Sequence, residues 1–249
     1  GEIGENSEFK ILAPTLRDMI RKTSFSMDSQ NWRKHFNGMF VGVESKFITL
    51  TASDGHRLAT CSNKIVGDVP SYLSGIIPRK AVNEIGKLLN DLSGEIIFSL
   101  GSNTVSIETP NTNFVSKLID GSDKINYQRV VPVGEAPELK VNTKELSDII
   151  SRVSVLSGGG VKGIKLNIGS ESVLVSSNNP EQEAGEESFR SDFNGDDIEI
   201  AFSVNYIQEM LSNIDSEHCI FNIYGSDKSC LVTSTSDSEL KYVIAPLLL

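Results

Sequence analysis

The sequence predicts an α+β protein made of two tandem domains, each of which is itself a repeat of helix and strand segments. Two observations lead to this fold class. The 249 residues repeat their own order of segments once, and within each copy short amphipathic helices alternate with groups of strands. A chain of this length holds one large or two ordinary domains and can bury a real core.

The first helix of each copy carries the same apolar pattern. Residues 16–20 (LRDMI) and 146–150 (LSDII) place apolar side chains at i, i+3 and i+4, which predicts one buried face on a short helix. Pro14 suits the first turn of the earlier helix, and Asn142 with Glu145 resembles a capping box for the later one. Both segments are therefore expected to be helices.

The remaining segments match in the same order. The matched pairs are strands at 37–41 and 162–166, strands at 47–50 and 173–176, helices carrying 82–89 and 207–214, and strands at 96–98 and 219–221. Chance could produce any one match, but four in one order are hard to explain that way. Pro and Gly interrupt the pattern at 131–137, so we place the domains at 9–130 and 131–249.

Composition limits the classes of function. With 39% hydrophobic and 22% charged residues, no apolar run as long as a membrane span and no signal peptide at the start, the chain is expected to be a cytoplasmic protein. Three widely spaced cysteines predict reduced thiols. The net charge of −10 argues against charge-driven binding of nucleic acid over the whole surface, but it permits a local basic face.

Residues 47–60 contain the most informative stretch. An alternating strand runs into Asp54-Gly55, a pair typical of turns, and a return segment carries His56 and Arg57. This hairpin could simply be a solvated rim. A catalytic group of Ser53, Asp54 and His56 is disfavoured because sequence neighbours rarely face one another at a turn. With three histidines and no metal-ligand or phosphate-loop motif, no cofactor and no enzyme activity are expected.

Several strings resemble the bacterial DNA polymerase III beta subunit, the sliding clamp family. They are residues 53–59 (SDGHRLA), 76–80 (IIPRK), 116–121 (SKLIDG), 178–183 (NNPEQE) and 242–246 (YVIAP). The resemblance covers about 9–249 in one register and matches the family's second and third domains.

The resemblance implies tandem DNA-clamp domains in a ring around duplex DNA, with the sheets outside and the helices on the inner face. The complete protein is then a head-to-tail homodimer that tethers the DNA polymerase III alpha subunit, clamp-loader subunits and other partners during replication. Residues 1–8 are expected to be a domain boundary or tag remnant. Without a first domain this fragment is expected to be monomeric, and its alternative function is that of a peptide-binding adaptor that does not encircle DNA.

A DNA-facing surface is expected on the helices and in the loop before the first central strand. Its predicted residues are Arg17, Arg21 and Lys22 on the first helix, Gln30, Arg33, Lys34 and His35 in the loop, Arg79, Lys80 and Lys87 at the second helix, and Lys144 and Arg152 on the third. Ordinary solvated helix faces are the alternative for each residue. His35 also stands where the family has an aromatic residue.

The resemblance further implies a groove between the two domains that receives a short peptide motif with apolar anchors. Its predicted residues are Phe36, Ser53, Gly55, His56, Arg57, Leu58, Ile125, Arg129, Val130, Tyr206, Ser229, Val243, Ala245, Pro246, Leu247 and Leu248. Ser53 replaces a usual Thr, Ile125 a usual Pro, and the Leu-rich end a Met- and Arg-containing one. The groove is therefore expected to be more apolar than usual, although the alternative for 243–249 is a terminal strand with an apolar tail.

Overall fold

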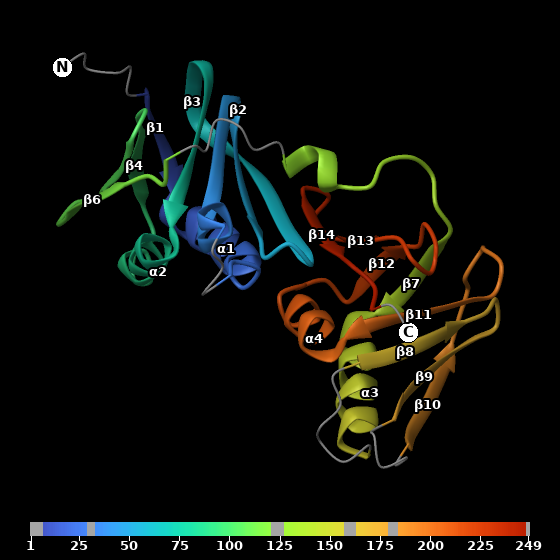
Figure 1. The fold of residues 1–249 in the computed structure, drawn as a ribbon. Helices are drawn as coiled ribbons and strands as arrows, with labels where there is room; N and C mark the ends of the chain where they lie inside the picture. The colour runs from blue at the N-terminus through green and yellow to red at the C-terminus, as the bar shows by residue number, and fades with distance from the viewer. Residues whose placement is uncertain (1–6, 29–32, 121–126, 157–162, 179–183, 248–249) are drawn as a thin grey trace. The chain divides into compact units, whose positions relative to one another are not determined.

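The fold was analysed in a computed structural model that describes residues 7–28, 33–120, 127–156, 163–178 and 184–247 (Figure 1). The chain forms two compact units, Gly1–Tyr127 and Gln128–Leu249, and each is described by itself. The segment 131–137 contains neither helix nor strand. The predicted Gln30, Ile125 and Leu248 lie outside the described residues.

Unit 1 begins with a strand and a helix and continues through a long hairpin. Its elements are β1 (Ser7–Leu12), α1 (Ala13–Ser24), a 3-10 turn (Lys34–Asn37), β2 (Gly38–Ser53), β3 (Arg57–Pro78), α2 (Arg79–Leu88), β4 (Glu95–Leu100), β5 (Thr104–Glu108) and β6 (Asn113–Lys117). The strands pair in the order β6-β5-β4-β1-β3-β2, with every pairing antiparallel.

Unit 2 repeats this order after a 3-10 turn at Tyr127–Val130. Its elements are β7 (Glu138–Asn142), α3 (Thr143–Leu156), β8 (Gly163–Ile168), β9 (Ser172–Asn178), β10 (Ala184–Arg190), β11 (Ile198–Ser203), α4 (Val204–Ser212), β12 (His218–Asn222), β13 (Cys230–Ser234) and β14 (Leu240–Ile244). The strands pair as β14-β13-β12-β7 and as β10-β9-β8-β11.

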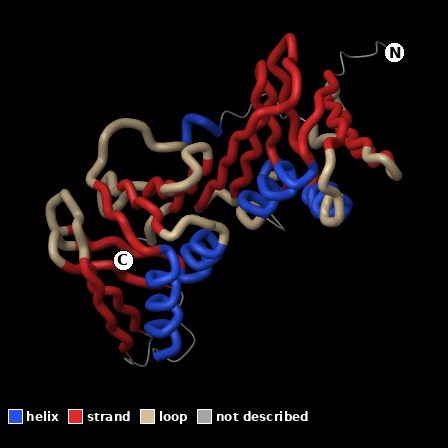
Figure 2. The backbone as a smooth tube through the Cα atoms, turned by 180° about the vertical axis from the view of Figure 1, so that it is seen from behind, coloured by secondary structure: helices blue, strands red, loops and turns tan. Residues whose placement is uncertain are grey.

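The predicted repeat and the α+β class are confirmed. Both units read strand, helix, strands, helix, strands, and in each the two helices lie side by side (Figure 2). The units differ between their helices, where β2 and β3 take the place of the four shorter strands β8 to β11. Ser45, with φ of 53°, interrupts the pairing of β2 with β3, which shifts register on both sides of it.

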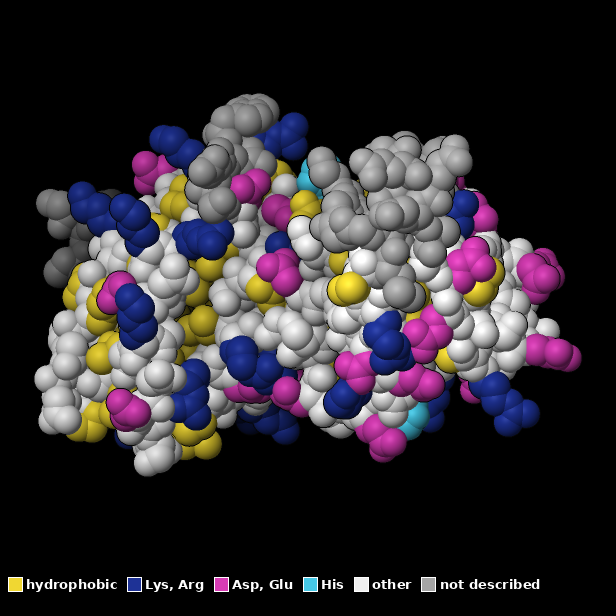
Figure 3. Space-filling view, turned by 90° about the horizontal axis from the view of Figure 1, so that it is seen from below, with side chains coloured by type: hydrophobic (Ala, Val, Ile, Leu, Met, Phe, Trp, Pro, Cys, Tyr) yellow, Lys and Arg dark blue, Asp and Glu magenta, His cyan; other side chains and the backbone are white. Residues whose placement is uncertain are grey.

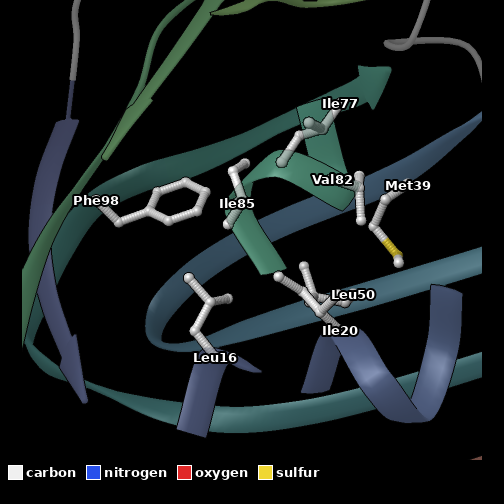
Figure 4. Close-up of a pocket in the computed structure, with 8 residues that line it drawn as sticks. All are labelled: Leu16, Ile20, Met39, Leu50, Ile77, Val82, Ile85 and Phe98. Carbon is white, nitrogen blue, oxygen red and sulfur yellow. The ribbon is translucent and has the colours of Figure 1, made fainter. Parts of the chain in front are cut away.

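The core of unit 1 lies between the helices and the strands. Leu16 and Ile20 of α1 face Val82 and Ile85 of α2, and a cavity of only about 10 Å³ remains among them (Figure 4). The strands close this cavity with Met39, Leu50, Ile77 and Phe98. The apolar i, i+3 and i+4 positions therefore form a closely packed interior.

The helices of unit 2 are joined by a polar bridge. Ser147 Oγ donates to Gln208 Oε1 (2.7 Å), and Gln208 Nε2 donates to the carbonyl O of Ser147 and to Ser151 Oγ, both at 2.9 Å. Ile149 and Ile150 of α3 are buried. α3 and α4 thus contact each other through polar side chains, while α3 also carries buried apolar ones.

The helix starts follow the sequence more closely than the helix ends. Pro14 lies in the first turn of α1, and Asn142 Oδ1 accepts a hydrogen bond from Glu145 N (3.0 Å), as expected. The predicted second helices were too long. Leu89 is the C-cap of α2, and Ile214 lies beyond Asn213, the C-cap of α4. Both residues are buried, because a tight turn after each helix continues to bury apolar side chains.

Candidate peptide-binding and DNA-facing surfaces

The turn between β2 and β3 is built by its own side chains. Ser53 Oγ accepts a hydrogen bond from Gly55 N (3.1 Å) and donates one to the carbonyl O of Arg57 (2.7 Å). Asp54 Oδ1 accepts from the backbone N of His56 (2.9 Å) and of Arg57 (3.1 Å). Gly55 adopts φ of 94°, which only glycine takes freely. The predicted hairpin is thus confirmed, and its turn has a fixed shape.

Arg57 ties this turn to the end of α1. Its Nε donates to Asp54 Oδ2 (3.0 Å), its Nη2 donates to the carbonyl O of Phe25 (2.9 Å), and its Cζ lies 5.4 Å from the centre of the Phe25 ring. The side chains of Arg57 and Asp54 are only 11% and 9% exposed. His56, between them, is exposed. The turn therefore exposes His56 on a backbone that the buried side chains of Asp54 and Arg57 fix in place.

These contacts also describe the three residues considered as a catalytic group. The Ser53 hydroxyl bonds a backbone carbonyl, and the Asp54 carboxylate bonds two backbone N–H groups and a guanidinium. Each is part of the architecture of the turn. Gly55 also packs on Phe36, since a Cβ at residue 55 would lie 3.3 Å from the Phe36 ring.

The C-terminal segment of unit 2 supplies the second group of predicted groove residues. Val243 on β14 is buried, Ala245 and Pro246 are half-buried, and Leu247 is 39% exposed. Leu247 N donates to the carbonyl O of Ala201 (2.8 Å). A Cβ on Gly163 would lie 3.1 Å from Leu247 Cδ1. The tail after β14 is therefore fixed beside β8 and β11.

The other predicted groove residues differ in exposure. Leu58 is buried in unit 1, Tyr206 and Ser229 are half-buried in unit 2, and Arg129 and Val130 are exposed on the 3-10 turn. The described groove residues of unit 1 thus lie at or near the β2–β3 turn, whereas those of unit 2 are spread over the 3-10 turn Tyr127–Val130, α4, the residue before β13, and β14 with its tail.

Four of the predicted DNA-facing residues of unit 1 line a groove of about 910 Å³ between α1 and α2. Arg17, Arg21, Lys80 and Lys87 contribute to its wall. Arg17 also bonds the end of α2, because its Nη1 donates to the carbonyl O of Leu89 (3.4 Å) and to that of Asn90. The helix C-terminus attracts a cation, so Arg17 joins the two helices.

Asp18 organises the basic residues of α1. Its carboxylate lies 2.7 Å from Arg21 Nη2 and 2.7 Å from Lys22 Nζ. Burial raises the pKa of Asp18, but hydrogen bonds from Lys22 and Arg21 outweigh burial and hold it below the usual value of 3.8. Lys22, which was predicted for the DNA-facing surface of this helix, is buried with 8% exposure. Its stem packs inward while its ammonium reaches Asp18.

Other predicted DNA-facing cations also have acidic partners. Lys87 pairs with Glu84 (2.9 Å) and Lys144 with Asp148 (2.5 Å). Arg152 bonds Glu187 of β10 with two nitrogens, at 2.6 and 3.0 Å. Basic and acidic side chains are accordingly interspersed on the face seen in Figure 3. These basic residues belong to a mixed surface.

The remaining basic residues lie around the start of α2 and the 3-10 turn before β2. Arg79 Nη1 donates to the carbonyl O of Met27 (3.1 Å), whereas Lys80, Arg33 and Lys34 are exposed. His35 is half-buried, and burial together with the charge of Arg33 lowers its pKa.

The groups that hold these side chains were not predicted from the sequence. Asp18, three and four residues before Arg21 and Lys22, had a recognisable helix spacing. Asp54 was recognised only as a turn residue, and the contact of Arg57 with Phe25, 32 residues away, has no signal in the sequence.

No helix in the described part of the chain is long and apolar enough to cross a membrane. Within the same described ranges, no group of three His, Cys, Asp or Glu side chains is placed to hold a metal ion.

Comparison with known families matches nearly the whole chain. The model of the DNA polymerase III beta subunit central domain matches residues 10–122, and that of the C-terminal domain matches 128–248. A crystal structure of the DNA polymerase III subunit beta from Pseudomonas aeruginosa is 34% identical, with a TM-score of 0.93, over 99% of this chain and 68% of that one. The chain belongs to the DNA polymerase III beta subunit family.

Curated relatives carry the name beta sliding clamp. That of P. aeruginosa is 35% identical over 241 residues, and that of Escherichia coli K12 is 31% identical over 240. Each alignment covers 96% of this chain and 65% of the relative. The chain therefore spans just under two thirds of the length of these sliding clamps, and the resemblance to the family's central and C-terminal domains is confirmed.

Proposed function

We propose that this chain is part of a non-catalytic processivity clamp for DNA replication in the bacterial cytoplasm. The complete protein would encircle duplex DNA as a head-to-tail homodimer. The observation that supports this most directly is the match of both domains, in order, to the central and C-terminal domains of the DNA polymerase III beta subunit. The TM-score of 0.93 to the P. aeruginosa structure supports it further.

In this proposal the partners bind through the residues that were predicted for the peptide groove. The β2–β3 turn offers exposed His56 on a rigid backbone, with Phe36 beside it. The tail of unit 2 offers the partly exposed Leu247. Apolar pockets with a few well-placed polar groups suit a short linear peptide with apolar anchors. The polymerase III alpha subunit and clamp-loader subunits are the proposed partners of this site.

Duplex DNA is proposed to pass the helix faces with weak direct contact. A ring retains DNA by topology, so strong phosphate contacts are unnecessary and would slow sliding. Arg21, Lys87 and Arg152 are each bonded to a carboxylate, which limits the positive charge available to phosphates. The mixed helix face therefore supports a passing contact and not a tight one.

The test is titration of a fluorescent peptide carrying the clamp-binding motif into this chain, beside His56→Ala, Leu247→Ala and the double variant. Saturable binding is expected, and the double variant is expected to weaken it at least tenfold, or about 1.4 kcal/mol. Val115→Ala removes a similarly exposed apolar side chain on β6 (61% exposed) and should leave the affinity unchanged. Absence of saturable wild-type binding would refute the proposed groove.

A further inference from the structure

The Asp54–Arg57 ion pair is placed to support the β2–β3 turn. Its two side chains are about 90% buried, although they belong to an exposed turn. One carboxylate oxygen of Asp54 accepts from two backbone N–H groups, while the other bonds the guanidinium of Arg57. A single acid thus shapes the turn and anchors it.

The anchor reaches a segment that is itself fixed from several directions. Arg57 bonds the carbonyl O of Phe25 and covers its ring. Two residues on, Arg79 of α2 bonds the carbonyl O of Met27 (3.1 Å), and Asp28 N donates to the carbonyl O of Phe36 (2.9 Å). The turn therefore rests on a segment tied to α2 and to the 3-10 turn before β2.

We propose that Asp54 and Arg57 are positioning residues of the peptide site: they hold the 53–57 turn so that His56 faces the ligand. This inference rests on the proposed peptide-binding function. It adds a supporting role to the contact expected of Arg57, because its Nε bonds Asp54 and its Nη2 bonds the Phe25 carbonyl.

The chemistry of the two residues allows their roles to be separated. Asp54→Asn keeps a side-chain oxygen for the backbone N–H groups of His56 and Arg57 but removes the charge that holds the guanidinium. Asp54→Ala removes both. Arg57→Lys keeps the positive charge but lacks the planar fork that bonds Asp54 and the Phe25 carbonyl together.

The decisive experiment is a double-mutant cycle on peptide affinity. His56→Ala is introduced into the wild type and into the Asp54→Ala, Asp54→Asn and Arg57→Lys backgrounds. If His56→Ala costs about tenfold in the wild type, we expect it to cost less than about threefold after Asp54→Ala or Arg57→Lys, because His56 is then no longer held in place. Asp54→Asn should lie between these limits.

A matched control separates positioning from general loss of stability. Glu84→Ala breaks the exposed Lys87–Glu84 pair on α2 and should leave the full effect of His56→Ala. Hydrogen exchange gives a second readout: the backbone amides of His56 and Arg57 should exchange at least tenfold faster in Asp54→Ala, while the amides of β4 stay protected.

Each outcome bears on the inference. If His56→Ala keeps its full effect in the Asp54→Ala and Arg57→Lys backgrounds, the positioning role is wrong. If Arg57→Ala weakens binding and Arg57→Lys restores it completely, Arg57 contacts the peptide through its charge and the inference also fails. If the wild type binds no peptide, the proposed function falls and this inference falls with it. Asp54→Asn, the mildest change, keeps the test usable should Asp54→Ala fold poorly.

Discussion

Replacing Gly55 by alanine should weaken peptide binding through the backbone alone. Gly55 has φ of 94°, and an added Cβ would lie 3.3 and 3.5 Å from two atoms of the Phe36 ring. A left-handed conformation costs an L-residue about 1–2 kcal/mol. The contact with Phe36 requires a shift of only a few tenths of an ångström. The turn can thus either keep its shape at that cost or relax and move His56.

Gly67 provides a matched control within the same unit. It adopts φ of 103°, and an added Cβ would meet nothing within 4 Å. Gly67→Ala therefore carries a similar backbone cost without a change near residues 53–57. Both variants should lose about 1–2 kcal/mol of unfolding free energy.

The assay combines urea unfolding with peptide titration on the same preparations. Only Gly55→Ala should also lose peptide affinity, by about tenfold if the relaxed turn forfeits roughly 1.4 kcal/mol of binding. Equal losses of affinity in both variants would mean that binding merely follows stability. Unchanged affinity in Gly55→Ala, with the stability loss present, would refute the expectation that the turn relaxes and moves His56.

Three further outcomes are expected. Asp18 has a pKa below 3.8 in the folded chain, so its stabilising effect is complete above about pH 4 and is lost as the pH falls further. In urea unfolding at successive pH values, the free energy of unfolding of the wild type should therefore approach that of Asp18→Asn in that acid range. Gly38→Ala should cost about 1–3 kcal/mol by the same assay, because its Cβ would lie 2.5 Å from the carbonyl O of Ile77 on the paired strand, whereas Gly94→Ala, with nothing within 4 Å, should be nearly neutral. Burial raises the pKa of Cys219 to about 11, so at about pH 8 iodoacetamide should label this thiol only after unfolding, as mass spectrometry can show; rapid labelling of the folded chain would contradict its burial.

The sequence predicts the helices and their repetition because their buried faces follow a regular period. The apolar positions at 16–20 and 146–150 lie on buried helix faces, and the cap at Asn142 forms as expected. The helix ends are harder to predict because Leu89 and Ile214 remain buried after the helical hydrogen bonds stop. Apolar periodicity reports burial, and burial continues past the last helical residue.

Lys22 shows a second limit of pattern reading. It lies at the border of the apolar stripe of α1, where a long side chain can bury its stem and still place its ammonium on Asp18. A pattern that counts lysine only as polar assigns it to the exposed face.

The candidate site is predictable where its geometry is local. The Asp54-Gly55 pair predicts the turn because the hydrogen bonds that form it span at most four residues. The support from Phe25 is not predictable, since only the fold brings that carbonyl to Arg57. The sequence therefore predicts the residues of the turn, while the structure is needed to find the distant residue that supports it.

The pairing of cations with carboxylates also limits the distance over which the basic residues of the helices can attract a polyanion. A bonded pair such as Arg152 with Glu187, or Lys144 with Asp148, is a dipole, and its field declines with distance faster than that of a lone charge. Beyond about 8 Å, the screening length at physiological salt, a polyanion would meet chiefly the net charge of −10, which repels it. Attraction is thus confined to close range, so long-range electrostatics alone would not draw a duplex from solution to these helices.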